Sequence, residues 1–200
     1  PIGTLQVGTH VSIQNELGGF PVSDTYTVLP GDQINIGNSD AVATLTMDAG
    51  TLYIHANSSL TLNQSEGVYT IALTSGSMGY DLDNRGSIKI ISSGKEITPV
   101  ATDGASSGAV ALGPNGKLVV VPVLGDAVAK ADNGIVTTIS QGYTWTDDGK
   151  DAELTLTQVQ TPGEMSTVTK SLIAISVVAG IVVVNEVVIK GDKKSKSPSS

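Results

Sequence analysis

Apolar and polar residues alternate along most of this chain, and Gly, Pro, Asn and Asp interrupt the alternation at intervals of about eight to twelve residues. A period of two puts successive side chains on opposite faces of a strand, so each alternating run predicts a half-buried β-strand. Many short strands between tight turns are typical of a β-sandwich. Strands, some alternating and some continuously apolar, are predicted at residues 5–13, 26–29, 34–36, 41–47, 52–54, 60–62, 68–73, 88–91, 110–112, 118–124, 127–129, 135–139, 143–145 and 153–157.

The turn residues and the composition favour the same fold class. Pro30-Gly31-Asp32 is a turn sequence, and Asn115-Gly116 and Asn133-Gly134 predict tight hairpins. The chain has 23 Gly, which disfavours long helices, and is 40% hydrophobic, which is too apolar for disorder. We therefore expect an all-β, antiparallel, jelly-roll-like β-sandwich with no helix before residue 165.

The pattern also suggests a domain organisation. Residues 1–160 form the sandwich body, as one domain or as two stacked halves at about 1–85 and 86–160. A linker at 161–170, rich in turn formers, leads to a hydrophobic segment at 171–190, and a Lys/Ser-rich tail occupies 191–200.

Several motifs of the body resemble FecR-type domains. They are Pro-Gly-Asp-Gln-Ile at 30–34, Asp-Ala-Gly-Thr-Leu-Tyr-Ile at 48–54, Ile-Ala-Leu-Thr-Ser-Gly at 71–76, the span 116–125 and Ile-Ser-Gln-Gly at 139–142. The resemblance covers about residues 1–150. It implies an antiparallel β-sandwich that lies outside the cytoplasmic membrane.

The signalling members of that family are anti-sigma regulators, in which a cytoplasmic region and a membrane span precede the β domain. In this sequence the β domain comes first and a hydrophobic segment follows it. We therefore do not expect a role in iron-citrate signal transduction.

Charge and cysteine content exclude several functions. Residues 1–170 carry seven basic and 17 acidic side chains, a net charge of −10, whereas residues 171–200 carry +2. An acidic body repels phosphate backbones, so we expect no nucleic-acid partner. The chain has no Cys, which excludes disulfides, thiolate metal sites and a cysteine nucleophile.

No catalytic signature stands out. His10 and His55 are the only histidines, and both lie in alternating strand patterns. Residues 81–86 lack the ligand spacing of a calcium loop, because Arg85 and Ser92 take the fifth and twelfth positions. Asp147, Asp148 and Asp151 are adequately explained as turn residues. We expect no enzyme activity, no cofactor and no metal.

The C-terminal apolar segment (residues 172–189) is the main functional candidate. Eleven of its 18 residues are Val or Ile, and a lysine-rich tail follows it. The proposed insertion residues are Leu172, Ile173, Ile175, Val177, Val178, Ile181, Val182, Val183, Val184, Val187, Val188 and Ile189, and the tail charges are Lys190, Lys193, Lys194 and Lys196.

Two environments can bury this segment. As a helix it would measure about 27 Å, close to the thickness of a bilayer core, and the lysines resemble a positive-inside stop. Against this, Asn185 and Glu186 interrupt it and no Trp or Tyr marks an interface. The Val and Ile content favours a strand that adds to a neighbouring sheet, although an apolar helix in a filament core would serve equally well.

We therefore expect an extracellular or cell-surface filament subunit. Its partners would be copies of itself, joined head to tail by the C-terminal segment in the manner of donor-strand assembly. The alternative is a ligand-binding or sensory domain anchored in the inner membrane by a C-terminal helix and facing the periplasm.

Overall fold

The computed structural model describes residues 1–8, 10–37, 42–83 and 86–148, and the strands Thr157–Gln158, Ile173–Val178 and Ile181–Glu186. The chain divides into two compact units, a body at Pro1–Pro162 and a C-terminal unit at Gly163–Ser200. Every regular element in the described residues is a strand, so the predicted all-β fold is confirmed.

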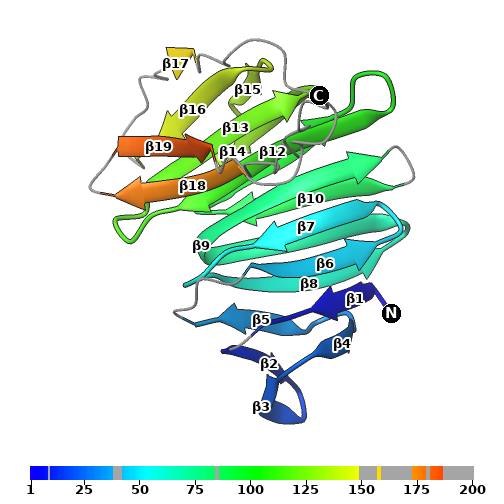
Figure 1. Ribbon diagram of the computed structural model, residues 1–200. Coiled ribbons are helices and arrows are strands. Elements are labelled where there is room, and N and C mark those ends of the chain that lie inside the picture. The colour runs from blue at the N-terminus through cyan, green and yellow to red at the C-terminus, as the bar shows by residue number, and fades with distance from the viewer. Residues whose placement is uncertain are drawn as a thin grey trace, which may run out of the picture. The chain divides into compact units, whose positions relative to one another are not determined.

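The strands of the body follow one another closely along the chain (Figure 1). They are β1 Gly3–Gln6, β2 Val11–Asn15, β3 Gly18–Val22, β4 Thr25–Val28, β5 Gln33–Ile36, β6 Ala43–Met47, β7 Gly50–Ile54, β8 Ser59–Ser65, β9 Val68–Asp83, β10 Ser87–Ser92, β11 Lys95–Val100, β12 Ala105–Leu112, β13 Leu118–Leu124, β14 Asp126–Ala131, β15 Val136–Ile139, β16 Tyr143–Asp147 and β17 Thr157–Gln158.

These strands form two sheets that share β9. The first sheet has the order β4-β1-β6-β7-β9-β12-β13-β16, and β17 pairs with the start of β16. The second has the order β3-β2-β5-β8-β9-β10-β11-β14-β15. Among the described strands all pairings are antiparallel except that of β9 with β10.

Strand β9 joins the two sheets because its halves pair with different strands. Residues Val68–Ser75 pair with β8, and Gly76–Asp83 pair with β12. The change of sheet occurs at Gly76, whose φ of 79° is readily adopted only by glycine. A Cβ at Gly76 would also collide with Ser58 of the loop before β8.

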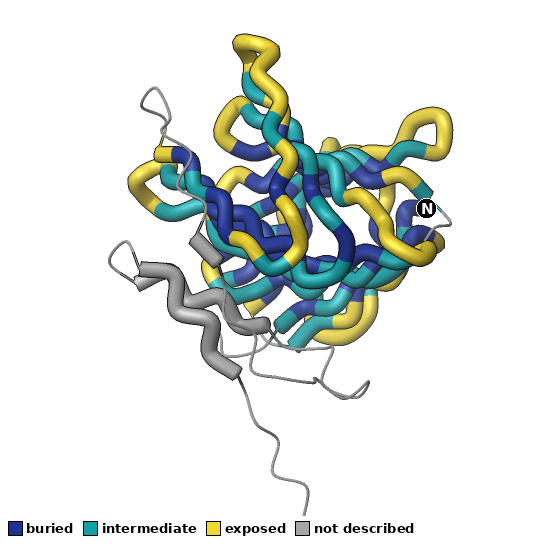
Figure 2. Tube along the Cα trace, turned by 90° about the horizontal axis from the view of Figure 1, so that it is seen from above, coloured by how far each residue is buried: buried dark blue, intermediate teal, exposed yellow. Residues whose placement is uncertain are grey.

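The core lies between the two sheets, and Figure 2 shows its buried residues at the centre of the body with exposed turns around them. In many strands alternate residues point inward, as the period of two predicts; β5, for example, has the burial order half-buried, buried, half-buried, buried. Strand β13 differs, because five consecutive residues are buried. The largest fully buried side chains are Leu5, Ile13, Ile34, Leu45, Leu52, Ile54, Leu60, Leu62, Ile71, Leu73, Met78 and Ile90.

The hairpins predicted at Asn115-Gly116 and Asn133-Gly134 are confirmed. Strands β12 and β13 pair across the first, and β14 and β15 pair across the second. In both turns the glycine N–H donates to a carbonyl three residues earlier, Gly116 to Gly113 and Gly134 to Ala131.

The single strand predicted at residues 5–13 is wrong. Strand β1 ends at Gln6 in the first sheet, and β2 begins at Val11 in the second. His10, with a φ of 65°, lies at the corner between them. The alternation continued through this corner because Leu5 and Ile13 both face the same core from opposite sheets.

The C-terminal unit contains a two-stranded antiparallel sheet. Strand β18, Ile173–Val178, pairs with β19, Ile181–Glu186, so that Ile175 lies opposite Val184. The predicted linker at 161–170 and the predicted tail at 191–200 lie outside the described residues.

Candidate assembly site

Within the C-terminal apolar segment, the described residues form the two paired strands β18 and β19, which we call the β18–β19 hairpin. Of the proposed insertion residues, Ile173, Ile175, Val177 and Val178 belong to β18, and Ile181, Val182, Val183 and Val184 belong to β19. Leu172, Val187, Val188, Ile189, Lys190, Lys193, Lys194 and Lys196 lie outside the described residues. Within the described part of the chain, no helix is long and apolar enough to cross a membrane.

A two-stranded sheet is only marginally stable alone, because it has too little apolar area to bury and leaves an unpaired edge on each strand. In the described residues, β18 and β19 pair only with each other.

A second surface relevant to assembly lies at one end of the body, which we call the β3–β4 end. It comprises β3, β4, the turn between β2 and β3, and Leu29. Strand β4 is the edge of the first sheet and β3 is the edge of the second. Figure 1 shows both strands at one end of the body, with β13 to β16 at the other.

A buried carboxylate fixes the shape of this end. Asp32 is only 2% exposed and accepts hydrogen bonds from Asn15 Nδ2 at 3.1 Å, Tyr26 Oη at 3.0 Å and the backbone N–H of Leu29 at 2.8 Å. These donors come from β2, β4 and the residue that follows β4, so one side chain connects the edges of both sheets. Burial and the hydrogen bond to Asp32 raise the pKa of Tyr26.

Apolar side chains are exposed near the Asp32 hydrogen bonds at the β3–β4 end. Leu17 is 94% exposed at the turn, and Leu29 is 47% exposed after β4. Phe20 of β3 packs edge to face on Tyr26 of β4 with ring centroids 5.7 Å apart, so an aromatic pair joins the two edge strands. These exposed apolar side chains make the β3–β4 end a candidate interaction site.

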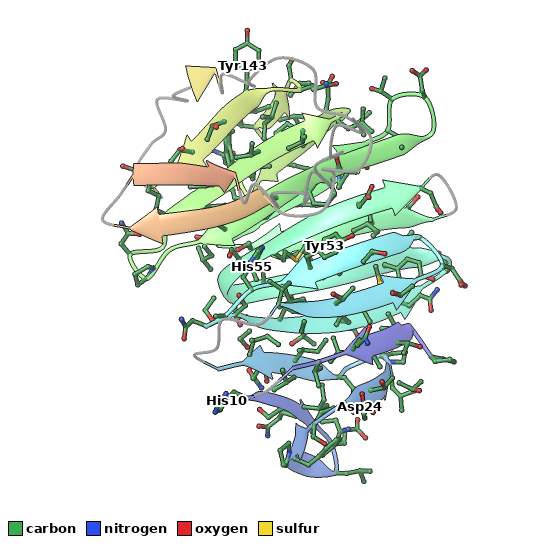
Figure 3. All side chains as sticks on the ribbon, viewed as in Figure 1. His10, Asp24, Tyr53, His55 and Tyr143 are labelled. Atoms are coloured by element: carbon green, nitrogen blue, oxygen red, sulfur yellow. The ribbon has the colours of Figure 1, made fainter. Side chains whose placement is uncertain are left out.

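The histidines and carboxylates considered as candidate site residues in the sequence do not form a cluster in the described part of the structure. Figure 3 shows His10 beside β2 and His55 beside β7, well apart. Burial lowers the pKa of His55. No group of three or more potential metal ligands occurs in the described residues. Asp81 and Asp83 are part of β9, while Asn84, Arg85 and Asp151 lie outside the described residues.

One ion pair connects the two sheets. Lys95 Nζ of β11 lies 3.0 Å from Asp147 Oδ2 of β16, and the Asp147 side chain is only 6% exposed. Asp147 thus has a structural partner, which the turn interpretation from the sequence did not include. Trp145, two residues earlier, is 3% exposed and lies in the core.

Sequence reasoning missed the β3–β4 end. Its edge position depends on pairing between distant strands, which periodicity does not reveal. One signal was available: the first 84 residues contain eight Asp and Glu side chains and no Lys or Arg.

Comparison with known proteins supports the fold class and little more. No family model matches the chain, and no curated protein matches it. Similar solved structures include two crystal structures, at 1.65 Å and 2.50 Å resolution, of a protein from Parabacteroides distasonis ATCC 8503 described as a putative anti-sigma factor. Each aligns with a TM-score of 0.52 at 10% sequence identity, covering 64% of this chain and 59% of that chain. At this identity the likeness shows a shared fold alone, and membership of the FecR-type family stays a prediction.

Proposed function

We propose that this chain is a structural, self-assembling protein of the cell exterior, and that its C-terminal apolar segment inserts into a neighbouring copy. The observation that carries the proposal is the β18–β19 hairpin, an apolar two-stranded sheet that belongs to a compact unit of its own. The described core of the body is made by residues from Ile2 to Trp145, so the body has an apolar interior without these two strands.

The physical argument rests on the apolar composition of β18 and β19 and on the small size of a two-stranded sheet. Addition of the hairpin to the sheet edge of another copy would bury its apolar side chains and enlarge the sheet, and in such contacts backbone hydrogen bonds supply affinity and alternate side chains supply fit. A contact between two different surfaces of identical subunits does not close on itself, and its repetition gives an open filament.

A second candidate is a membrane-anchored ligand-binding or sensory domain of the FecR type, tethered by a C-terminal transmembrane helix. Its support is the fold likeness to the protein described as a putative anti-sigma factor and the resemblance of the body's motifs. The length of the apolar segment and the lysines after it are compatible with such an anchor.

Sedimentation of purified protein in buffer without lipid or detergent separates the two candidates. We expect the full-length chain to form large assemblies and a chain that ends at Thr161 to remain monomeric. The full-length variant Val183→Lys, which puts a charge into β19, should assemble at least tenfold more slowly than the conservative variant Val183→Ile. A full-length chain that sediments as a monomer in detergent and aggregates irregularly without it would favour the membrane anchor.

A further inference from the structure

We propose that the β3–β4 end is the surface that receives the C-terminal segment of a second copy, with the β18–β19 hairpin added to the free edge of β4. The inference rests on the proposed function, and it assigns the receiving site within that function. Three independent features of the described residues carry it: backbone pairing, exposed apolar side chains and charge.

The first feature is the free edge of β4. This strand pairs with β1 and with no other described strand. The N–H of Val7 donates to the carbonyl of Asp24, and backbone groups alternate in direction along a strand, so those of Thr25 and Thr27 point away from β1. Strand β3, the other edge at this end, contains Pro21, which lacks a donor and protects that edge. The receiving edge is therefore β4.

The second feature is the apolar rim. Phe20 packs on Tyr26 of β4, Leu29 follows β4, and Leu17 is exposed in the turn between β2 and β3. The hydrogen bonds of Asp32 hold β4 and Leu29 in place. A rigid surface loses little conformational entropy on binding, so more of the gain from apolar burial appears as affinity. A Val- and Ile-rich hairpin would bury these exposed apolar side chains against its own.

The third feature is charge, and it distinguishes the two ends of the body. The β3–β4 end carries the exposed carboxylates of Glu16 and Asp24, and no basic residue occurs before Arg85. The opposite end also exposes apolar side chains, at Ile135, Val136 and Tyr143, but its charges are mixed, because Lys130 and Asp132 are both exposed there. The C-terminal residues 171–200 carry Lys190, Lys193, Lys194 and Lys196 and a net charge of +2, so a docked hairpin brings net positive charge to an acidic surface.

Cysteine cross-linking tests the position directly, because the wild-type chain has no Cys and each variant carries a single thiol. Thr27→Cys on the outer edge of β4 is mixed with Ser176→Cys on β18, and both are full-length chains. We expect a disulfide-linked pair of the two variants to form during assembly. The matched control is Thr46→Cys, an exposed threonine on the interior strand β6, which should give at least tenfold less cross-linked pair.

Charge reversal tests the electrostatic part. Glu16→Lys should slow assembly several-fold at low salt, and a second change, Lys193→Glu, should restore the rate. Glu66→Lys makes the same change of net charge at the exposed turn between β8 and β9, and should have a smaller effect. Rescue of Glu16→Lys by Lys193→Glu requires that the two residues approach each other, which a general effect of net charge does not.

The outcomes of these experiments distinguish an error in the receiving site from an error in the proposed function. If wild-type protein forms no fibres without lipid, the proposed function fails and the inference fails with it. If fibres form, but Thr27→Cys cross-links no better than Thr46→Cys and Lys193→Glu rescues nothing, assembly stands and the β3–β4 site is wrong. If a dilute Thr27→Cys/Ser176→Cys double variant forms its disulfide within one chain in preference to between chains, the occupant is the chain's own hairpin and the second copy is excluded.

Discussion

At the scale of single residues, Asp32 stabilises the part of the sandwich that contains the edge strand β4. Its carboxylate is almost fully buried, and each of its three hydrogen bonds fixes a different part of the β3–β4 end. Hydrogen bonds to a buried charged acceptor are among the stronger ones, and an unsatisfied donor in the same place is costly. The residue therefore has a structural role at the candidate site.

Asp32→Ala should lower the free energy of unfolding by about 2–4 kcal/mol, because three donors lose their acceptor in a buried place. The matched control is Asp24→Ala, which removes an exposed carboxylate eight residues earlier and should change stability by less than about 0.5 kcal/mol. Urea unfolding of both variants gives the comparison. Equal stability losses in the two variants would show that the Asp32 network does not hold this end together.

His55 gives the body a dependence of stability on pH. Burial lowers the pKa of His55 below its ordinary value of 6.5, so the unfolded chain binds the proton more readily than the folded one. The contribution of neutral His55 to the free energy of unfolding is fully present above pH 6.5. It is lost as the pH falls from 6.5 through the lower pKa of His55 in the folded state. Urea unfolding at pH 7.5, 6.5 and 5.5 should show this loss in the wild type and a shallower loss in His55→Gln.

At the scale of elements, the sequence predicted strands and turns better than it predicted which sheet a strand joins. The hairpin of β12 and β13 was predictable because two apolar runs flank the turn sequence Asn115-Gly116. The corner at His10 was not predictable, since the sequence alternates with a period of two both before and after it. The ion pair of Lys95 with Asp147 was also hidden, because it joins residues 52 positions apart. Fold class was thus accessible from local chemistry, whereas the edges that define the candidate site follow from long-range pairing.

Gly76, where β9 changes sheet, is a position that should be sensitive to substitution. Gly76→Ala should lower the free energy of unfolding by about 2 kcal/mol or more, because φ is positive and the new Cβ meets Ser58. Gly116 is the matched control, since its φ is also 79° but a Cβ there meets nothing within 4 Å. Thermal unfolding should rank Gly76→Ala well below Gly116→Ala. The same melting temperature for both would contradict the steric part of this account.

At the scale of the whole molecule, the C-terminal unit is what distinguishes this chain from a self-contained β-sandwich. The described body has its own core, whereas the β18–β19 hairpin has too few strands for independent stability. The body is acidic and the C-terminal residues are basic, so encounters between copies are favoured in one orientation. Because exposed charges are screened within about 10 Å at 0.1 M salt, the rate of assembly should fall as salt rises.

The most direct test of assembly through the C-terminal segment is electron microscopy of the purified full-length protein in buffer without lipid or detergent. We expect unbranched fibres of uniform width, and at the same concentration separate particles from a chain that ends at Thr161. Full-length protein that stays as small particles, or enters solution only with detergent, would contradict the account.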